Sequence, residues 1–154
     1  MPKTRIEAVE ERAGSGYPAP YDAPCRERYT RRLSDAVKIN QFGVNYVRLS
    51  PGAWSSQRHW HSHEDELVYM LEGEAMLITD QGEQTLRAGN VVGFPAGEAN
   101  GHHLVNRSEA DCVFLVIGNR DERDEGHYTD IDMHAPADRY ARGFHPTRKN
   151  GSPL

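Results

Sequence analysis

The chain has 154 residues, of which 37% are hydrophobic and 27% charged, and a formal net charge of −5 at pH 7. This length suits one structural domain that can bury a core without help from a metal or a disulfide. The acidic balance argues against a general nucleic-acid binder, and the longest wholly aliphatic or aromatic run, Val113–Ile117, is far too short to span a membrane.

The sequence shows neither a signal peptide nor a disulfide framework, and both bear on where in the cell the protein is expected. The first residues, beginning Met1-Pro2-Lys3, lack the apolar core of a signal peptide. The two cysteines, Cys25 and Cys112, are too few for a disulfide framework. We therefore expect a cytoplasmic protein.

Composition divides the chain into an N-terminal arm (1–40), a core (41–118) and a C-terminal extension (119–154). The arm is rich in charge, proline and glycine, and Gly14–Pro20 cannot be a helix interior because proline lacks the backbone donor. We expect an extended arm with one short helical or turn piece near Asp22–Leu33. The C-terminal extension is again polar, and we expect the histidines in it to be solvated.

Short apolar runs alternate with turn signals through residues 41–118. Strands and turns recur at intervals of roughly 8–12 residues without a helical period, which predicts an all-β sandwich or barrel. Asp80-Gln81-Gly82 is typical of a tight hairpin. The expected strands are Phe42–Ser50, Arg58–His63, Leu67–Glu72, Glu74–Thr79, Glu83–Arg87, Val91–Phe94, His102–Asn106 and Cys112–Gly118.

The first histidine cluster lies at 58–66. Alternate residues of a strand share a face, so His59 and His61 project together, and Glu66 can return to the same point across a short turn. His61 and His63 form an alternative pair, although His63 fits better at the rim. Asp65 is a candidate to orient a ligand histidine. Trp60 faces the opposite side of the strand, where we expect it to pack.

The second cluster offers His102 or His103 from a strand distant in sequence. Spacing and strand parity favour His102 over His103, because a shift of one residue turns every side chain to the other face. Three imidazoles and one carboxylate suit Mn, Fe, Co, Ni, Cu or Zn, whereas Ca and Mg prefer oxygen ligands alone. We therefore expect one divalent transition metal ion.

At these residues the sequence resembles the cupin superfamily. The first cupin motif corresponds to Gly52, His59-Trp60-His61, four residues, Glu66, six residues and Gly73. The second corresponds to Gly89, five residues, Pro95-Ala96-Gly97, a spacer, His102, three residues and Asn106. The spacer after Gly97 is two residues longer than the common pattern, which we interpret as a longer loop. The closer resemblance is to small single-domain bacterial cupins.

The resemblance implies a small antiparallel double-stranded β-helix, or jelly-roll barrel, with extended arms at both ends. It implies that His59, His61, Glu66 and His102 ligate the metal near one mouth of the barrel. The expected function is that of a metal-dependent enzyme acting on a small polar or carboxylated molecule. Whether it is a dioxygenase, isomerase, decarboxylase or lyase stays open. Glu66 is either a ligand or, if it swings free, the catalytic general base.

Two alternatives remain: a non-catalytic module or sensor that binds a metal or small molecule, and a scaffold that mainly dimerises. No DNA-reading helix-turn-helix is evident. An extended arm is stabilised most by covering a sheet edge of another subunit, so we expect a homodimer. Tyr46 and Arg48 share one strand face, which lines the pocket if it points inward and is exterior otherwise. Asn106 is expected to be a structural hydrogen-bonding residue.

Overall fold

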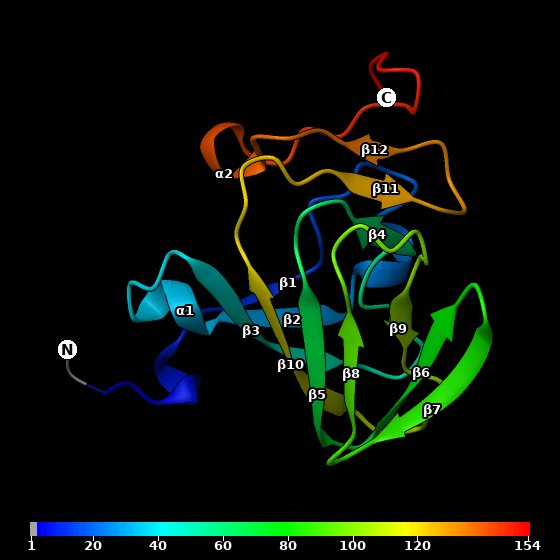
Figure 1. Cartoon of the computed structure of the whole chain (residues 1–154). Helices are drawn as coiled ribbons and strands as arrows, with labels where there is room; N and C mark the ends of the chain where they lie inside the picture. The colour runs from blue at the N-terminus through cyan, green and yellow to red at the C-terminus, as the bar shows by residue number, and fades with distance from the viewer. Residues whose placement is uncertain (1–2) are drawn as a thin grey trace.

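The computed structural model describes residues 3–154, which form three antiparallel sheets (Figure 1). The largest sheet has the strand order β1-β2-β3-β10-β5-β8: Glu11–Ala13, Arg28–Arg32, Phe42–Leu49, Cys112–Asn119, Glu66–Glu72 and Val91–Phe94. The second has the order β7-β6-β9: Gly82–Arg87, Glu74–Thr79 and His103–Val105. The third has the order β12-β11-β4: His134–Ala135, Gly126–Tyr128 and His59–His61. The prediction of an all-β antiparallel fold is confirmed.

Helices are short and peripheral in the described residues. They are the 3-10 turns η1 (Ile6–Ala8) and η2 (Ala23–Cys25) and the single-turn helices α1 (Leu33–Ala36) and α2 (Arg139–Arg142). None of them has the length and apolar character needed to cross a membrane.

The main core lies between the six-stranded sheet and the β7-β6-β9 sheet. Alternate residues of β3, β5 and β10, among them Leu49, Met70 and Phe114, are fully buried in it, and Leu77 of β6 packs in the same cluster. This is the period of two that a half-buried strand requires. On β3 the buried residues alternate with Tyr46 and Arg48, so that pair is exterior.

Every strand expected between residues 42 and 118 is present, with small shifts at the ends. The most consequential shift is that β5 begins at Glu66. This residue is paired with Phe94 of β8 and Gly118 of β10, so it is fixed on a strand and does not lie in the preceding turn.

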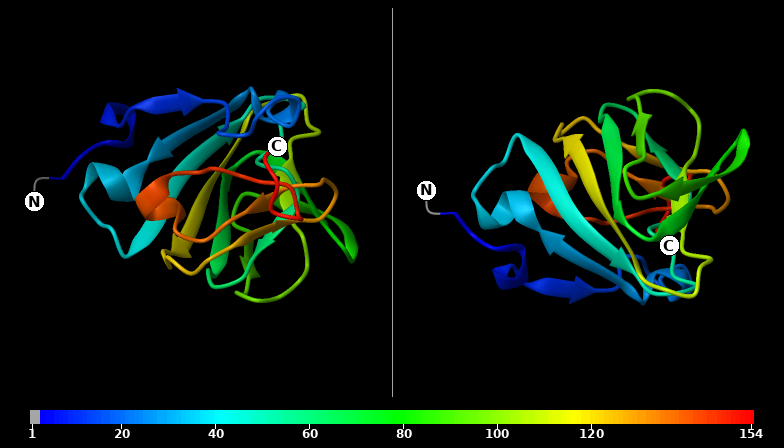
Figure 2. Two further views of the ribbon diagram at one scale, coloured as in Figure 1. Left: turned by 90° about the horizontal axis from the view of Figure 1, so that it is seen from above. Right: turned by 90° about the horizontal axis from the view of Figure 1, so that it is seen from below.

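The N-terminal segment differs from the expected arm. The piece expected near Asp22–Leu33 is a 3-10 turn at Ala23–Cys25, and most of the remainder is strand β2. β2 pairs with β3, and β1 adds to β2, so the segment covers a sheet edge of its own chain (Figure 2). The argument for a dimer through this arm therefore does not hold, and the homodimer stays a prediction.

The C-terminal extension folds back over the sheets. β11 pairs with β4, and His127 stacks on Trp60 with ring centroids 4.1 Å apart. Trp60 thus packs as expected. The expectation that the tail histidines are solvated is wrong for two of them, because His127 and His134 are half-buried and only His145 is exposed. The local polarity of this segment concealed the strand pairing that buries them.

Candidate metal centre

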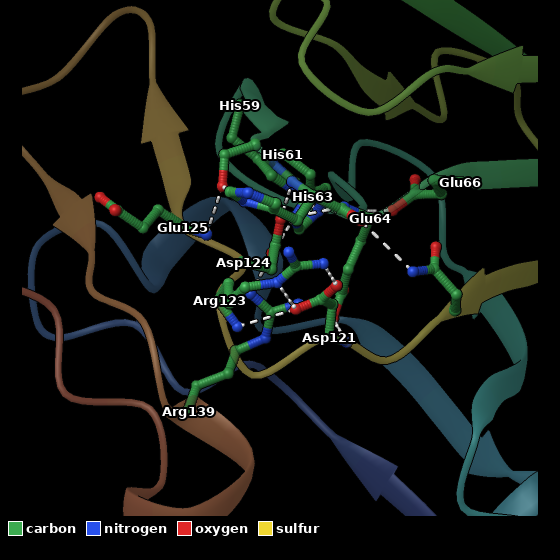
Figure 3. A network of polar contacts seen from close by, with 12 residues as sticks. His59, His61, His63, Glu64, Glu66, Asp121, Arg123, Asp124, Glu125 and Arg139 are labelled. Carbon is green, nitrogen blue, oxygen red and sulfur yellow. Dashed lines mark hydrogen bonds and ion pairs between the residues drawn. The ribbon is translucent and has the colours of Figure 1, made fainter.

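Strand β4 presents two histidines to one side. The rings of His59 and His61 meet edge to face, with their Nε2 atoms 3.2 Å apart (Figure 3). Trp60, between them in sequence, points to the other side, where it meets His127. The alternation along a single short strand therefore creates the pair.

The hydrogen bonds of the two rings determine where their protons lie. His59 Nδ1 is 2.8 Å from the carbonyl oxygen of Gln57, and His61 Nδ1 is 2.8 Å from Asp124 Oδ2. Both partners accept only, so both Nδ1 atoms donate, and a neutral ring has its lone pair on Nε2. Two lone pairs that face each other repel unless a cation or a proton lies between them. The pair therefore fits a bound metal ion.

Burial and charge act differently on the two rings. Burial lowers the pKa of His59 to about 3, so this ring stays neutral. Burial also disfavours the charged form of His61, but its hydrogen bond to Asp124 and the charge of Glu66 outweigh that effect and raise its pKa. A metal at this position therefore competes with a proton on His61.

Glu66 supplies the carboxylate from the first residue of β5. Its Oε2 lies 3.7 Å from His61 Nε2, and its Oε1 lies 3.3 Å from His102 Nε2. Burial raises the pKa of Glu66, but the hydrogen bond to His102 and the nearby imidazoles lower it to about 2. The group is thus ionised at neutral pH. Donor atoms of His59, His61 and Glu66 all lie within 4.8 Å of one another, a spacing that one ion can bridge.

His102 and His103 turn to different sides. The His102 ring stacks on Phe94 at a centroid distance of 3.5 Å and faces His59 at 5.3 Å. His103 Nδ1 instead donates to the Ser56 carbonyl at 2.8 Å, and its ring meets Trp54. The structure therefore brings His102 to the cluster and leaves His103 outside it. Three of the four side chains named from the sequence, His59, His61 and Glu66, bring donor atoms within reach of one ion. His102 joins them through its contact with Glu66 at 3.3 Å. The role of all four as metal ligands stays a prediction.

Two other candidates from the first cluster lie elsewhere. His63 is exposed and its Nδ1 contacts the Ser62 hydroxyl, so it is not part of the group. Asp65 accepts a hydrogen bond from the backbone N–H of Ala96 at 2.8 Å, which fixes a loop. The expectation that Asp65 orients a ligand histidine is wrong, because its carboxylate points to that loop.

Asp124 orients His61 instead. It is fully buried, accepts hydrogen bonds from His61 and from the backbone N–H of His63, and is ion-paired with Arg139 (Figure 3). Burial raises the pKa of Asp124, but these bonds outweigh it and hold the pKa far below its usual range. Arg139 also pairs with the buried Glu64. Sequence reasoning placed Asp124 in the polar extension, and no local pattern distinguishes it there.

A cavity of about 410 Å³ opens beside the cluster. Its lining includes His59, Glu66 and His102 together with three arginines: Arg28, Arg32 and Arg139. A second hollow of about 530 Å³ shares Glu66, Arg32 and Arg139 with it. A small molecule can therefore reach the cluster, and it would meet both imidazoles and guanidinium groups.

Comparisons with known proteins agree with this geometry. A family model described as a cupin domain matches residues 45–118. The chain is 47% identical to the crystal structure of a sugar phosphate isomerase from a cupin superfamily of Silicibacter pomeroyi, covering 99% of this chain and 96% of that one with a TM-score of 0.94. No curated protein matches the chain.

More distant structures share the fold with different names. A polyketide cyclase from Streptomyces resistomycificus is 26% identical, covering 79% of this chain and 80% of that one with a TM-score of 0.63. A protein of Acidithiobacillus ferrooxidans, described provisionally as a sugar phosphate isomerase, is 27% identical. The match covers 82% of this chain and 80% of that one, with a TM-score of 0.72.

Proposed function

The chain belongs to the cupin superfamily, and from this premise we propose that it is a metal-dependent isomerase that acts on a phosphorylated sugar. The observation that carries the proposal is the 47% identity, across 99% of the chain, to a protein named a sugar phosphate isomerase. The cluster of imidazoles and a carboxylate at a cavity of about 410 Å³ supports it. The proposal narrows the expectation of an enzyme for small polar or carboxylated molecules.

In this proposal His59, His61, Glu66 and His102 hold one divalent transition metal ion. The donor set of neutral imidazoles and one carboxylate suits Zn, Fe, Mn, Ni, Co or Cu. Such an ion, when bound, supplies positive charge that stabilises the oxygen anion developing as a sugar carbonyl enolises. Three of the four residues, His59, Glu66 and His102, line the cavity, which supports direct access of a substrate to them.

Interconversion of an aldose and a ketose moves one proton between adjacent carbons. A base takes the proton of the C–H bond beside the carbonyl, and the carbonyl oxygen gains a proton, which gives an enediol. The other hydroxyl of the enediol then loses its proton and becomes the new carbonyl, while a proton is added to the neighbouring carbon. A base must hold this proton. The hydrogen bond to His102 and the nearby imidazoles hold the pKa of Glu66 below its usual range, so its carboxylate is ionised. An ionised carboxylate is the form that both a metal ligand and a general base require, so Glu66 keeps both roles here and its catalytic role stays a prediction.

The test is isomerisation in deuterated water. Protein stripped of metal and reloaded in turn with Mn²⁺, Fe²⁺, Co²⁺, Ni²⁺, Zn²⁺ or Cu²⁺ is incubated with aldose and ketose phosphates of five and six carbons. NMR detects both the product and the exchange of the C–H hydrogen for deuterium. We expect both with at least one metal, and neither with the double variant His59→Ala, His61→Ala.

The control for that variant is its metal content, which should be lost while its strand signals in circular dichroism remain. Metal-loaded wild-type protein that neither interconverts these sugars nor exchanges their hydrogens would contradict the proposal. Metal and ligand binding without turnover would instead support the non-catalytic module.

A further inference from the structure

We infer that Arg28, assisted by Arg32, binds the phosphate group of the substrate in the cavity that the metal-ligand cluster lines; this inference rests on the proposed function. The cavity lining contains Arg28 and Arg32 together with His59, Glu66 and His102. A phosphate held by these arginines would leave the remainder of a small sugar facing the cluster.

Strand β2 places both arginines on the face that lines the cavity. In its pairing with β3, Arg28 lies opposite Leu49 and Arg32 opposite Asn45. Leu49 is fully buried, and directly paired residues of neighbouring strands share a face of the sheet. A strand face that packs on a core normally carries apolar side chains. The guanidinium group of Arg28, opposite the buried Leu49, therefore needs an explanation, whereas Arg32 lies farther along the same face, where the strand is exposed.

The outward arginines of the same sheet have ordinary partners. Arg31 of β2 and Arg48 of β3 both pair with Glu11, at 3.3 Å and 2.9 Å. Arg139, which also lines the cavity, is neutralised by Glu64 and Asp124. Each of these charges is thus balanced within the chain.

Arg28 is not balanced in this way. Within residues 3–154 it has no carboxylate partner, and its Nε is buried without a hydrogen-bond partner. Arg32 is 59% exposed, and its ion pair with Asp35 is long, at 4.0 Å. Its guanidinium group therefore remains available at the cavity rim. A buried donor without a partner is costly, and an anion that accepts its hydrogen bond removes that cost.

Phosphate suits this position chemically. A guanidinium binds two phosphate oxygens at once with short, charge-assisted hydrogen bonds. Tyr17 lines the same cavity, and burial raises its pKa to about 12, so its hydroxyl keeps its proton and can donate. A cavity of about 410 Å³ is within the range of small-molecule sites. The arrangement thus offers charge, directed donors and space.

Calorimetric titration of metal-loaded protein tests the inference. The probes are inorganic phosphate, a five- or six-carbon sugar phosphate and the same sugar without phosphate. We expect Arg28→Gln to weaken binding of the phosphorylated probes by about tenfold or more, as the loss of a charged hydrogen bond implies. Binding of the unphosphorylated sugar and the metal content should not change.

Two further variants keep the test informative. Arg28→Lys preserves the charge but not the paired donors, so we expect an intermediate loss even if Arg28→Gln fails to fold. Arg26→Gln, at a side chain that is 69% exposed and paired with Asp22, is the matched control and should bind like the wild type. Wild-type protein that does not bind phosphate, or folded Arg28 variants that bind it unchanged, would overturn the inference.

The outcome is separable from that of the proposed function. Phosphate binding that depends on Arg28 without isomerisation would support the subsite and count against the isomerase. If Arg28→Gln isomerises the sugar phosphate with the same KM as the wild type, the isomerase is supported and the phosphate subsite at Arg28 is contradicted.

Discussion

His102 and His103 are adjacent in sequence but contact different groups, which gives opposite predictions for them. His102 faces Glu66 at 3.3 Å, whereas His103 is bonded to the carbonyl of Ser56. We expect His102→Gln to lower metal affinity by tenfold or more, as loss of a ligand should, and His103→Gln to keep it. Competition with a chelator, followed by metal analysis, measures both. If His103→Gln loses metal affinity and His102→Gln keeps it, His103 and not His102 is the metal ligand.

Asp124 acts through another residue, so its removal should weaken metal binding without removing a ligand. In Asp124→Asn an amide replaces the carboxylate that holds His61 Nδ1 at 2.8 Å. We expect metal affinity to fall by about 10- to 100-fold, the usual effect of losing such a partner. Chelator competition is again the measurement. Asp121→Asn is the control, because that carboxylate pairs with Arg123 on the surface; an equal loss there would contradict the assignment.

The metal-ligand residues could be predicted from the sequence, but the residue that orients His61 could not. His59, His61 and Glu66 were identifiable because the strand period and a short turn place them together, and these are local properties. Asp124 reaches His61 only because β11 pairs with β4 across more than 60 positions. No local pattern encodes that pairing, so the group that orients the ligand was not identifiable.

At the scale of the elements, Gly118 sets how closely β10 approaches the start of β5. A Cβ at Gly118 would lie 2.7 Å from the carbonyl oxygen of Asp65, which real contacts do not allow. We expect Gly118→Ala to push Glu66 away from the histidines and to lower both the free energy of unfolding and metal affinity. Chemical denaturation and chelator competition measure the two effects.

The matched control is Gly93→Ala on β8. Gly93 also pairs with β5, but a Cβ there would meet no heavy atom within 4 Å. We expect little change in either quantity. Equal effects of the two substitutions would show that the approach of β10 to β5 does not position Glu66.

The same scale explains which strands were predictable. β3, β5 and β6 carry buried apolar residues at alternate positions, and β10 begins with a run of three buried apolar residues; these strands were expected. β2 was not, because its inward positions include Arg28 and Arg32, which line a cavity where the core would otherwise need apolar groups. The inner face of β2 therefore lacks the alternating apolar pattern by which the other strands could be recognised.

At the scale of the whole molecule, segments from the N-terminal and C-terminal parts of the chain pack against each other, next to His59 of the metal-ligand cluster. Tyr17 from the N-terminal segment packs edge-on against Tyr128 of β11 and Phe144 near the C-terminus. These contacts form a second apolar cluster with Met133 and Ala135. The polar appearance of both segments indicated separate arms, but the aromatic residues within them meet only in the folded chain.

Arg139 of α2 ties the C-terminal segment to the metal centre. Its guanidinium pairs with Glu64 and with Asp124, which are both buried. In Arg139→Gln these carboxylates lose their cation, and we expect the free energy of unfolding to fall by about 3–5 kcal/mol, as is usual when one partner of a buried pair is removed. Metal affinity should fall as well, because Asp124 would hold His61 less firmly.

Denaturant unfolding measures the stability, and hydrogen exchange shows where it is lost. We expect faster exchange at the backbone of 121–142 than in β3 and β10, since Arg139 joins that segment to the residues that precede β5. Arg142→Gln, at the exposed end of the same helix, should leave both unchanged. Because Glu64 contributes one of the two unpaired charges, adding Glu64→Gln to Arg139→Gln should recover part of the stability. If the double variant is less stable than Arg139→Gln alone, the ion pair is not what holds the segment in place.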